Sequence, residues 1–365
     1  MNILFLTNHL NVGGITSYTL TLATGLKKRG HNVHVASSGG ELLPSFIQQG
    51  VNFIPVPLRT KSEISPKLLI SLFRLLPLIK RYDINVIHAN SRTTQVLAGL
   101  ISVISKVKYV STCHGFFKVR FGRRFFPCWG KKVIAISSQV SQHLQDDFFV
   151  KESDIRIINN GINLERFKFI DASAQKEARR RFGISDNFVV GIIARLSDVK
   201  GHIYLIEAIK MVIEAVPSVK LLIVGEGKMK QKLDERINDL RIADNVVFLA
   251  HITDTREILA VMDVFVMPSL KEGLGLALME AMASGLAVVG SNVGGIKTLI
   301  QNNSNGLLVE PGDSAGLSRA ILGLLQDSSR RESLGRKARE FISQNFSQEK
   351  MILETERVYL ECILR

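Results

Sequence analysis

Short apolar runs alternate with longer amphipathic runs along most of the chain. In the first half, the strand-like residues 3–7, 33–37 and 86–89 are each followed by a run with helical spacing. A second series of the same kind starts at residue 189 and includes residues 264–267. Strands that alternate with helices form parallel sheets wrapped by helices, so we expect an α/β fold with two Rossmann-like domains.

A stretch without apolar periodicity separates the two series. It covers residues 167–185 and places a first domain at residues 1–168 and a second at residues 169–347. In residues 348–365, apolar side chains recur at helical spacing and predict a terminal helix. Open α/β sheets bind ligands outside the carboxyl ends of their strands, so candidate functional residues are expected at strand ends.

The excess of positive charge is confined to the first half. Residues 1–168 contain 22 Lys and Arg against 8 Asp and Glu, whereas residues 169–365 contain 25 of each kind. This asymmetry predicts a partner with fixed negative charge for the first domain, which could be an anionic membrane face, an acidic acceptor or nucleic acid.

Cysteine usage and hydropathy bear on the compartment. Cys113, Cys128 and Cys362 are scattered without metal-ligand spacing, which favours reduced thiols in a cytosol. The N-terminus lacks the basic region of a signal peptide, and no apolar run reaches the ~18 residues that a membrane span requires. We therefore expect a cytoplasmic protein that does not cross a bilayer.

The most specific motif lies at residues 268–285, where a strand-like run leads through glycines into a helical run. If the helix begins near Gly275, its free N–H groups and positive dipole end suit an anion. Glu272 would then lie in the loop before the helix, and Glu280 about one and a half turns into it. A ligand with a central phosphate and hydroxyl-bearing groups at either end would fit all three elements. The alternative is an amphipathic helix with two solvated glutamates.

The Glu-x7-Glu spacing, followed by Ala-Met-Ala-Ser-Gly and the pair Gly294-Gly295, resembles the donor site of family 4 retaining glycosyltransferases. The resemblance implies the GT-B fold, in which two Rossmann-like domains face each other across a cleft and the C-terminal helix returns to the first domain. It also implies transfer of a sugar from a nucleotide-sugar, such as a UDP- or GDP-sugar, to an acceptor hydroxyl. Glu280 would accept hydroxyls of the nucleotide ribose, and Glu272 hydroxyls of the donor sugar. The remaining donor-binding positions of this motif are Leu274, Gly275 and Leu276.

Other donor-side candidates follow neighbouring strands. Arg195 and Lys200 flank a turn after the strand-like residues 189–193, and two cations around such a turn can clamp a diphosphate. A solvated cation pair is the alternative interpretation. By resemblance, the backbone of His251 and Ile252 would contact the nucleobase.

The first domain contributes candidates of its own. Gly13 and Gly14 follow the first strand, and the resemblance places them at the acceptor site and over the donor phosphates, respectively; a turn that needs glycine only for steric reasons is the alternative. His114 follows a strand and resembles the family's histidine beside the donor sugar, so we expect His114, with Glu272, to be catalytic. His88 and Asn90 are candidates for the acceptor side.

The chain contains no Asp-x-Asp, the paired carboxylates with which many nucleotide-sugar enzymes hold phosphate through a metal. We therefore expect neutralisation of the phosphate charge by Arg195, Lys200 and the helix dipole, with no metal and no cofactor beyond the nucleotide-sugar.

Residues 116–132 interleave Lys and Arg with aromatic side chains and contain no acid. Such a segment predicts peripheral attachment to the inner face of the cytoplasmic membrane, near a lipid-linked or envelope-glycolipid acceptor. Neutralising Arg120, Arg123 and Arg124 should weaken binding to anionic vesicles. Residues 66–81 also mix Leu and Ile with Lys67, Arg74, Lys80 and Arg81. For this segment, an ordinary crossover helix is at least as good an interpretation as membrane contact. Nucleic acid has no obvious role in this fold.

Two other classes of protein fit the sequence less well. An NAD-dependent oxidoreductase needs a Gly-x-Gly-x-x-Gly turn after a strand, and residues 225–230 do not fit that pattern. A catalytically silent glycosyltransferase-like subunit is disfavoured because four candidate residues, Arg195, Lys200, Glu272 and Glu280, are all present.

Overall fold

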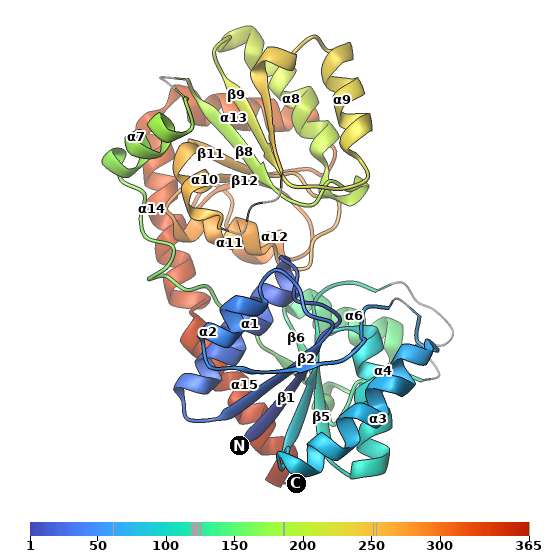
Figure 1. Ribbon diagram of the computed structural model, residues 1–365. Helices are drawn as coiled ribbons and strands as arrows, with labels where there is room; N and C mark the ends of the chain where they lie inside the picture. Colours follow the sequence, from blue (N-terminus) through green and yellow to red (C-terminus); the bar gives the residue numbers. More distant parts are fainter. Residues whose placement is uncertain are drawn as a thin grey trace. The chain divides into compact units, whose positions relative to one another are not determined.

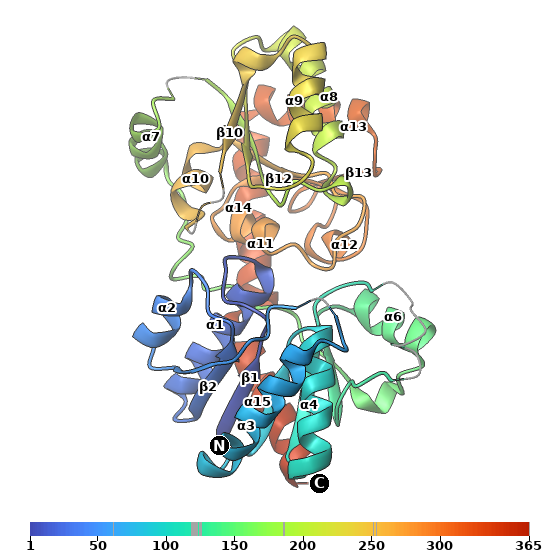
Figure 2. The ribbon, with the colours of Figure 1, turned by 45° about the vertical axis from the view of Figure 1, so that its right-hand side comes forward.

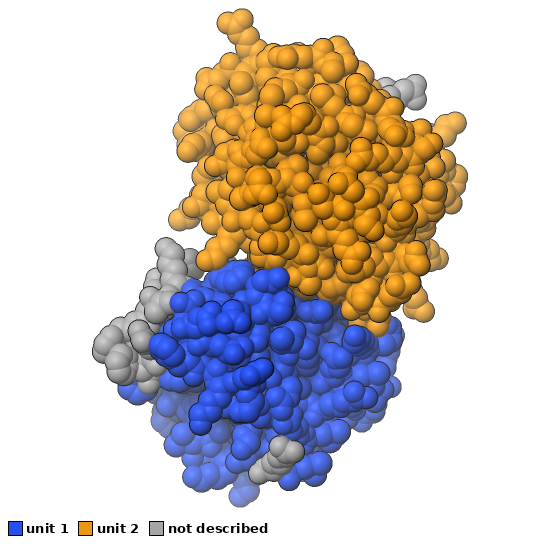
Figure 3. Space-filling view, turned by 180° about the vertical axis from the view of Figure 1, so that it is seen from behind, with its two compact units in different colours: residues 1–161, 348–365 blue, residues 162–347 orange. Residues whose placement is uncertain are grey.

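The computed structural model describes the whole chain except residues 61, 118–122, 124–125, 185–186, 251, 253 and 365. The chain forms two compact units, residues 1–161 with 348–365 and residues 162–347 (Figures 1 and 3). The first unit therefore ends at Gly161, whereas the sequence pattern placed the domain boundary after residue 168.

The first unit is built on a parallel sheet with the order β3-β2-β1-β4-β5-β6-β7. Its central strands are buried along nearly their whole length, which is why they are apolar runs and not alternating ones. The strands are β1 (Asn2–Leu6), β2 (Asn32–Ser37), β3 (Asn52–Pro55), β4 (Val86–Ala89), β5 (Lys108–Cys113), β6 (Lys132–Ala135) and β7 (Ile155–Ile157).

Helices cover both faces of this sheet. One core cluster joins the sheet to α1, α2 and α15, and another joins it to α3 and α4. The helices of the unit are α1 (Gly14–Lys28), α2 (Leu43–Gln48), α3 (Pro66–Arg81), α4 (Arg92–Ser105), α6 (Ser138–Phe148) and α15 (Gln348–Leu364), with a 3-10 turn at Glu152–Asp154.

The terminal helix α15 is part of the first unit's core. Met351, Ile352, Val358, Tyr359 and Cys362 are buried among residues of α1 and the sheet. The predicted return of the C-terminal helix to the first domain is therefore confirmed.

The second unit has a parallel sheet with the order β10-β9-β8-β11-β12-β13. The predicted α/β class with two Rossmann-like sheets is confirmed. The strands are β8 (Val189–Ile193), β9 (Lys220–Val224), β10 (Val246–Leu249), β11 (Val264–Met267), β12 (Ala287–Ser291) and β13 (Leu307–Val309).

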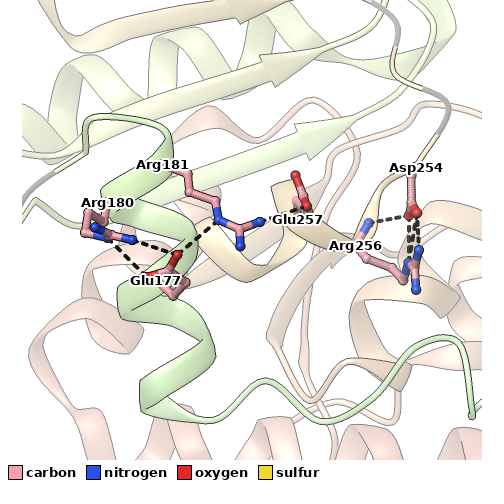
Figure 4. A network of polar contacts seen from close by, with 6 residues as sticks. All are labelled: Glu177, Arg180, Arg181, Asp254, Arg256 and Glu257. Atoms are coloured by element: carbon pink, nitrogen blue, oxygen red, sulfur yellow. Dashed lines mark hydrogen bonds and ion pairs between the residues drawn. The ribbon is translucent and has the colours of Figure 1, made fainter.

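One core cluster of this unit joins the sheet to α8, α9, α13 and α14. The helices α7 and α10 pack on each other and are linked at the surface by an ion pair between Arg181 and Glu257 (Figure 4). The helices are α7 (Ala172–Arg181), α8 (His202–Ala215), α9 (Lys230–Asp239), α10 (Arg256–Val261), α11 (Leu276–Ala283), α12 (Ile296–Leu299), α13 (Ser314–Gln326) and α14 (Ser328–Asn345), with 3-10 turns at Asp198–Lys200 and Ala243–Asn245.

No helix in the described part of the chain has both the length and the apolar composition that a bilayer crossing requires.

Candidate active site

The helix start at the centre of the predicted donor site is fixed by Gly275. Helix α11 begins at Leu276, and Gly275 is its N-cap with φ 91° and ψ 75°. This left-handed conformation favours glycine, and a Cβ atom at this position would lie 2.9 Å from Sδ of Met267. The predicted start near Gly275 is confirmed, with Glu280 four residues beyond Leu276 and Leu274 buried in the preceding loop.

A second glycine holds the loop that carries Glu272. The N–H of Gly295 donates a hydrogen bond to the carbonyl oxygen of Glu272 at 3.1 Å. A Cβ atom at Gly295 would lie only 2.1 Å from the carbonyl oxygen of Gly273. The pair Gly294-Gly295 therefore allows backbone-to-backbone packing that positions the glutamate.

Lys200 and Glu272 form an ion pair. Nζ of Lys200 lies 2.5 Å from Oε2 of Glu272, and both side chains are largely shielded from solvent, with exposed fractions of 20% and 12%. The hydroxyl of Ser269 donates to the same carboxylate oxygen at 3.3 Å. The sequence suggested that Lys200 clamps a diphosphate and that Glu272 binds a sugar, but it did not suggest that they contact each other.

The loops that carry these two residues are joined by their backbones. Leu270 N–H donates to the carbonyl of Val199 at 2.8 Å. Gly201 has φ 71°, and a Cβ atom there would lie 1.9 Å from the carbonyl oxygen of Pro268. The turn after β8 and the loop after β11 thus form one surface at the carboxyl ends of adjacent strands.

Arg195 follows β8 and is exposed. Among the described residues, no hydrogen bond or ion pair occupies its guanidinium group, whereas Lys200 is paired. Of the two cations, Arg195 is therefore the one whose charge is not already balanced by a described carboxylate.

The carboxyl group of Glu280 is poised to change its charge near neutral pH. Burial raises its pKa to about 7, although a hydrogen bond from the Thr255 hydroxyl to Oε2 at 2.9 Å and the charge of Arg166 act in the opposite direction. The nearby Asp254 stays ionised because hydrogen bonds from Arg256 hold its pKa at about 2 (Figure 4).

The predicted nucleobase contacts lie just before Thr255. Ile252 is half-buried. His251 lies outside the described residues, so its role stays a prediction.

In the first unit, the Gly13-Gly14 loop presents open backbone. Helix α1 begins at Gly14 with Gly13 as its N-cap, and no side chain caps its first N–H groups. Both glycines are exposed, and a Cβ atom at Gly13 would meet no other atom within 4 Å. Packing within the unit therefore does not require glycine at position 13, which argues against the purely steric interpretation there.

His114 and Asn90 form a pair at the ends of β5 and β4. Nε2 of His114 lies 3.2 Å from Oδ1 of Asn90. Burial lowers the pKa of His114 to about 3, so its imidazole is neutral at physiological pH. Asn90 is buried, and its Nδ2 donor has no partner among the described residues.

His88 is not placed to contact an acceptor. Its side chain has no exposed surface, and its nitrogens lie 2.5 Å from the Tyr359 hydroxyl and 2.7 Å from the Thr112 hydroxyl. Burial lowers its pKa to about 3. The expectation that His88 lines the acceptor side was wrong, because its position in the interior of β4 directs its imidazole to the terminal helix.

Among the described residues, no group of three imidazole, thiol or carboxylate side chains gathers as it would around a metal ion. Metal independence stays a prediction.

Comparison with known proteins adds two family models. The model described as Glycosyltransferase Family 4 matches residues 12–166, and the model described as Glycosyl transferases group 1 matches residues 174–341.

Relatives and solved structures match most of this chain. A UDP-Gal:alpha-D-GlcNAc-diphosphoundecaprenol alpha-1,3-galactosyltransferase of Escherichia coli is 30% identical over 293 residues, covering 75% of this chain and 74% of that protein. An N-acetyl-alpha-D-glucosaminyl L-malate synthase of Bacillus anthracis is 27% identical over 373 residues, covering 98% of this chain and 96% of that protein.

A glycosyltransferase from Rickettsia africae has a similar structure, with a TM-score of 0.86, 23% identity and coverage of 100% of this chain and 98% of that one. HepE of Anabaena, solved in complex with UDP and glucose, gives a TM-score of 0.84 at 24% identity and covers 98% of this chain and 99% of that one. With the two matched models and the relative from Escherichia coli, these similarities show that the chain belongs to glycosyltransferase family 4 and is a nucleotide-sugar-dependent glycosyltransferase of the GT-B fold.

Proposed function

We propose that the protein is a retaining, metal-independent glycosyltransferase that transfers a sugar to a lipid-linked or envelope-glycan acceptor at the cytoplasmic face of a membrane. The observation that carries the donor side of this proposal is the arrangement around α11. A shielded Lys200–Glu272 pair lies in the joined loops after β8 and β11, and Glu280 lies inside the helix whose N-terminus is capped by Gly275.

The ion pair suggests how the donor is received. A bound nucleotide-sugar offers phosphate oxygens to Lys200 and sugar hydroxyls to Glu272, so each member of the pair exchanges its partner for a group of the donor. Arg195 adds a second cation, and the N–H groups at the start of α11 add hydrogen-bond donors. The ribose hydroxyls donate to Glu280.

In the reaction, the bond between the anomeric carbon and the phosphate oxygen breaks while a bond to the acceptor oxygen forms on the same face of the sugar. The departing diphosphate gains negative charge, which Lys200 and Arg195 stabilise, and it takes the proton of the acceptor hydroxyl. His114 is neutral, with a pKa of about 3, which makes it a weak base and suits it to hydrogen bonding with the donor sugar.

Relatives support a lipid-linked acceptor. The Escherichia coli relative is named for transfer to a diphosphoundecaprenol-linked sugar, and a Rhizobium meliloti protein that is 33% identical over 196 residues is named for lipopolysaccharide core biosynthesis. The net charge of the first 168 residues supports attraction to an anionic membrane surface.

Within residues 116–132, Arg123 is packed against the protein. Arg120 and Arg124 lie outside the described residues. Arg123 is 8% exposed, and its guanidinium lies 3.9 Å from the centre of the Phe117 ring. Its neutralisation would therefore disturb packing as well as charge, and the vesicle test is better made with Arg120 and Arg124 alone.

The donor specificity is tested by thermal stabilisation with a panel of UDP-, GDP- and ADP-sugars, since a bound donor raises the melting temperature by mass action. The anomeric configuration of the product, read by NMR, tests retention. Unchanged turnover after dialysis against EDTA is the expected result for metal independence, and a strict, reversible requirement for a divalent ion would refute it.

A further inference from the structure

The first unit contains a cavity of about 520 Å³, widely open to solvent, beside the ends of β2 and β3 and next to α3. Phe53 and Val56 contribute apolar surface to its lining, and Arg59, Lys67 and Arg74 contribute three cations. Val56 is buried and Phe53 is half-buried, whereas the three cations are exposed. The cavity therefore combines apolar surface with basic groups.

No ion pair among the described residues balances the three cations of this cavity. Among the described residues, none that lines the cavity is an acid, and none of the ion pairs involves Arg59, Lys67 or Arg74. Lys67 Nζ makes a long hydrogen bond of 3.4 Å to the Arg59 carbonyl. Two guanidinium forks and one ammonium group on a single cavity suit an anion that carries more than one charge, such as a phosphate or diphosphate.

The helix that supplies two of these cations also exposes apolar side chains. Ile70 is three residues after Lys67 and four before Arg74, so the three share one side of α3. Ile70, Leu69 and Phe73 are 46%, 54% and 71% exposed. Figures 1 and 2 show α3 beside α4, at the outside of the first unit. Apolar side chains that project into solvent beside cations are typical of a surface that contacts an amphiphile.

The cavity also adjoins the loop that carries Gly13 and Gly14. Leu10 N–H donates to the carbonyl of Gly39, a residue of the cavity lining, at 2.8 Å. The N–H of Ser38, which also lines the cavity, donates to the carbonyl of Asn8 at 3.4 Å. A ligand in the cavity is therefore next to the loop proposed for the acceptor.

We infer that this cavity binds the phosphate or diphosphate of a lipid acceptor, with the acceptor's hydrocarbon chain against the exposed apolar side of α3. The inference rests on the proposed function and deepens it by naming the acceptor's chemistry. Helix α3 would then face the membrane in addition to residues 116–132, although its sequence alone fits an ordinary crossover helix at least as well as a membrane contact.

The test compares two double variants with equal loss of charge on the same helix. Lys67→Gln/Arg74→Gln removes cations that line the cavity, and Lys80→Gln/Arg81→Gln removes cations that do not. Each protein is floated with phosphatidylcholine vesicles that contain a polyprenyl diphosphate, and separately with vesicles in which phosphatidylglycerol supplies the same surface charge. Thermal stabilisation by UDP is measured in parallel, because it reports the second unit and not the cavity.

We expect the cavity pair to lose about tenfold or more in affinity for the polyprenyl diphosphate vesicles and the control pair to lose less than about threefold. Wild type should bind phosphatidylglycerol vesicles more weakly. Equal losses in the two variants, or no loss in either, would overturn the inference. Equal binding of wild type to both vesicle types would also overturn it, since the cavity would then hold a bulk lipid headgroup. Absence of UDP stabilisation in all proteins would count against the proposed function instead, while the lipid comparison still decides this inference.

Discussion

At the scale of single residues, the candidate site contains two carboxylates in contrasting environments. Glu272 forms an ion pair with Lys200, with 2.5 Å between Oε2 and Nζ. Among the described residues, the Thr255 hydroxyl alone is hydrogen-bonded to Glu280, and burial raises the pKa of Glu280 to about 7. Sequence spacing predicted the position of Glu280 within α11, because helix geometry fixes it, and placed Glu272 in the loop before the helix. It did not predict the ion pair or the shifted pKa, since these depend on burial and on residues from other loops.

The raised pKa of Glu280 predicts that nucleotide binding is coupled to proton release. Ribose hydroxyls donate to the carboxylate form, so affinity for UDP should fall, by up to about tenfold per pH unit, as the pH drops below 7. In the free protein the sign is opposite. The pKa is raised from 4.5, so this group's contribution to stability is fully present below pH 4.5 and is lost as the pH rises through about 7.

Calorimetry of UDP binding in buffers with different ionisation enthalpies measures the protons released. Glu280→Gln should remove the part of the release and of the pH dependence that Glu280 contributes, and leave the part due to the terminal phosphate of UDP, whose second pKa is about 6. Glu257→Gln, on the neighbouring helix and exposed, should leave both parts intact. If the affinity of the wild-type protein for UDP stays constant between about pH 5 and about pH 8, the role of Glu280 is contradicted.

The Lys200–Glu272 pair predicts different costs for its two members and for Arg195. Glu272→Gln should reduce kcat/KM roughly 10- to 150-fold, because a shielded acceptor for a sugar hydroxyl is lost at a cost of ~1.5 to 3 kcal/mol. Lys200→Ala and Arg195→Ala should both weaken UDP binding. Of these two substitutions, Lys200→Ala alone should also lower the melting temperature, because it leaves the mostly shielded Glu272 without its cation. Arg195 is exposed, so its loss should not.

Initial rates, UDP titrations and thermal melts of the three variants separate these effects. Turnover at the wild-type level in folded Glu272→Gln would refute the site assignment.

At the scale of elements, glycines decide how close the site loops approach each other. The sequence showed Gly13-Gly14 and Gly294-Gly295 as similar pairs, but the structure gives them different surroundings. At Gly295 a Cβ atom would clash with the Gly273 carbonyl, and at Gly13 it would meet nothing. A sequence pattern cannot separate these cases, because the contacts come from residues that are distant along the chain.

This difference predicts that the same change, glycine to alanine, has different effects at positions 295 and 13. Gly295→Ala should destabilise the protein by ~1 to 3 kcal/mol and weaken UDP binding, because the loop that holds Glu272 must shift. Gly13→Ala should leave the melting temperature unchanged and raise KM for the acceptor, because the methyl group projects into open space at the proposed ligand surface. Denaturant melts with UDP and acceptor titrations check both. Equal destabilisation by the two substitutions would show that the loop packing has been assigned wrongly.

At the scale of the whole molecule, each unit has its own core, and the last helix belongs to the unit in which the chain begins. The alternation of strands and helices predicted both sheets, because parallel sheets need buried strands and covering helices. The return of α15 followed from resemblance and not from periodicity, since an amphipathic stripe shows that a helix is packed but not on which unit.

The contact between Tyr359 and His88 gives this return of α15 a testable consequence. The Tyr359 hydroxyl lies 2.5 Å from Nδ1 of His88, and both side chains are fully buried. Tyr359→Phe leaves that nitrogen without its hydroxyl partner and should destabilise the first unit by ~1 to 3 kcal/mol. The second unit does not contain this contact, so UDP binding should be preserved.

Tyr204→Phe makes the same chemical change in the second unit, where the side chain is only half-buried, and serves as the control. Hydrogen exchange resolved by peptide should show faster opening of β4, β5 and α15 in Tyr359→Phe alone. Uniformly faster exchange in both units would mean that α15 stabilises the molecule as one cooperative body, and unchanged exchange would mean that the buried hydrogen bond contributes no stability.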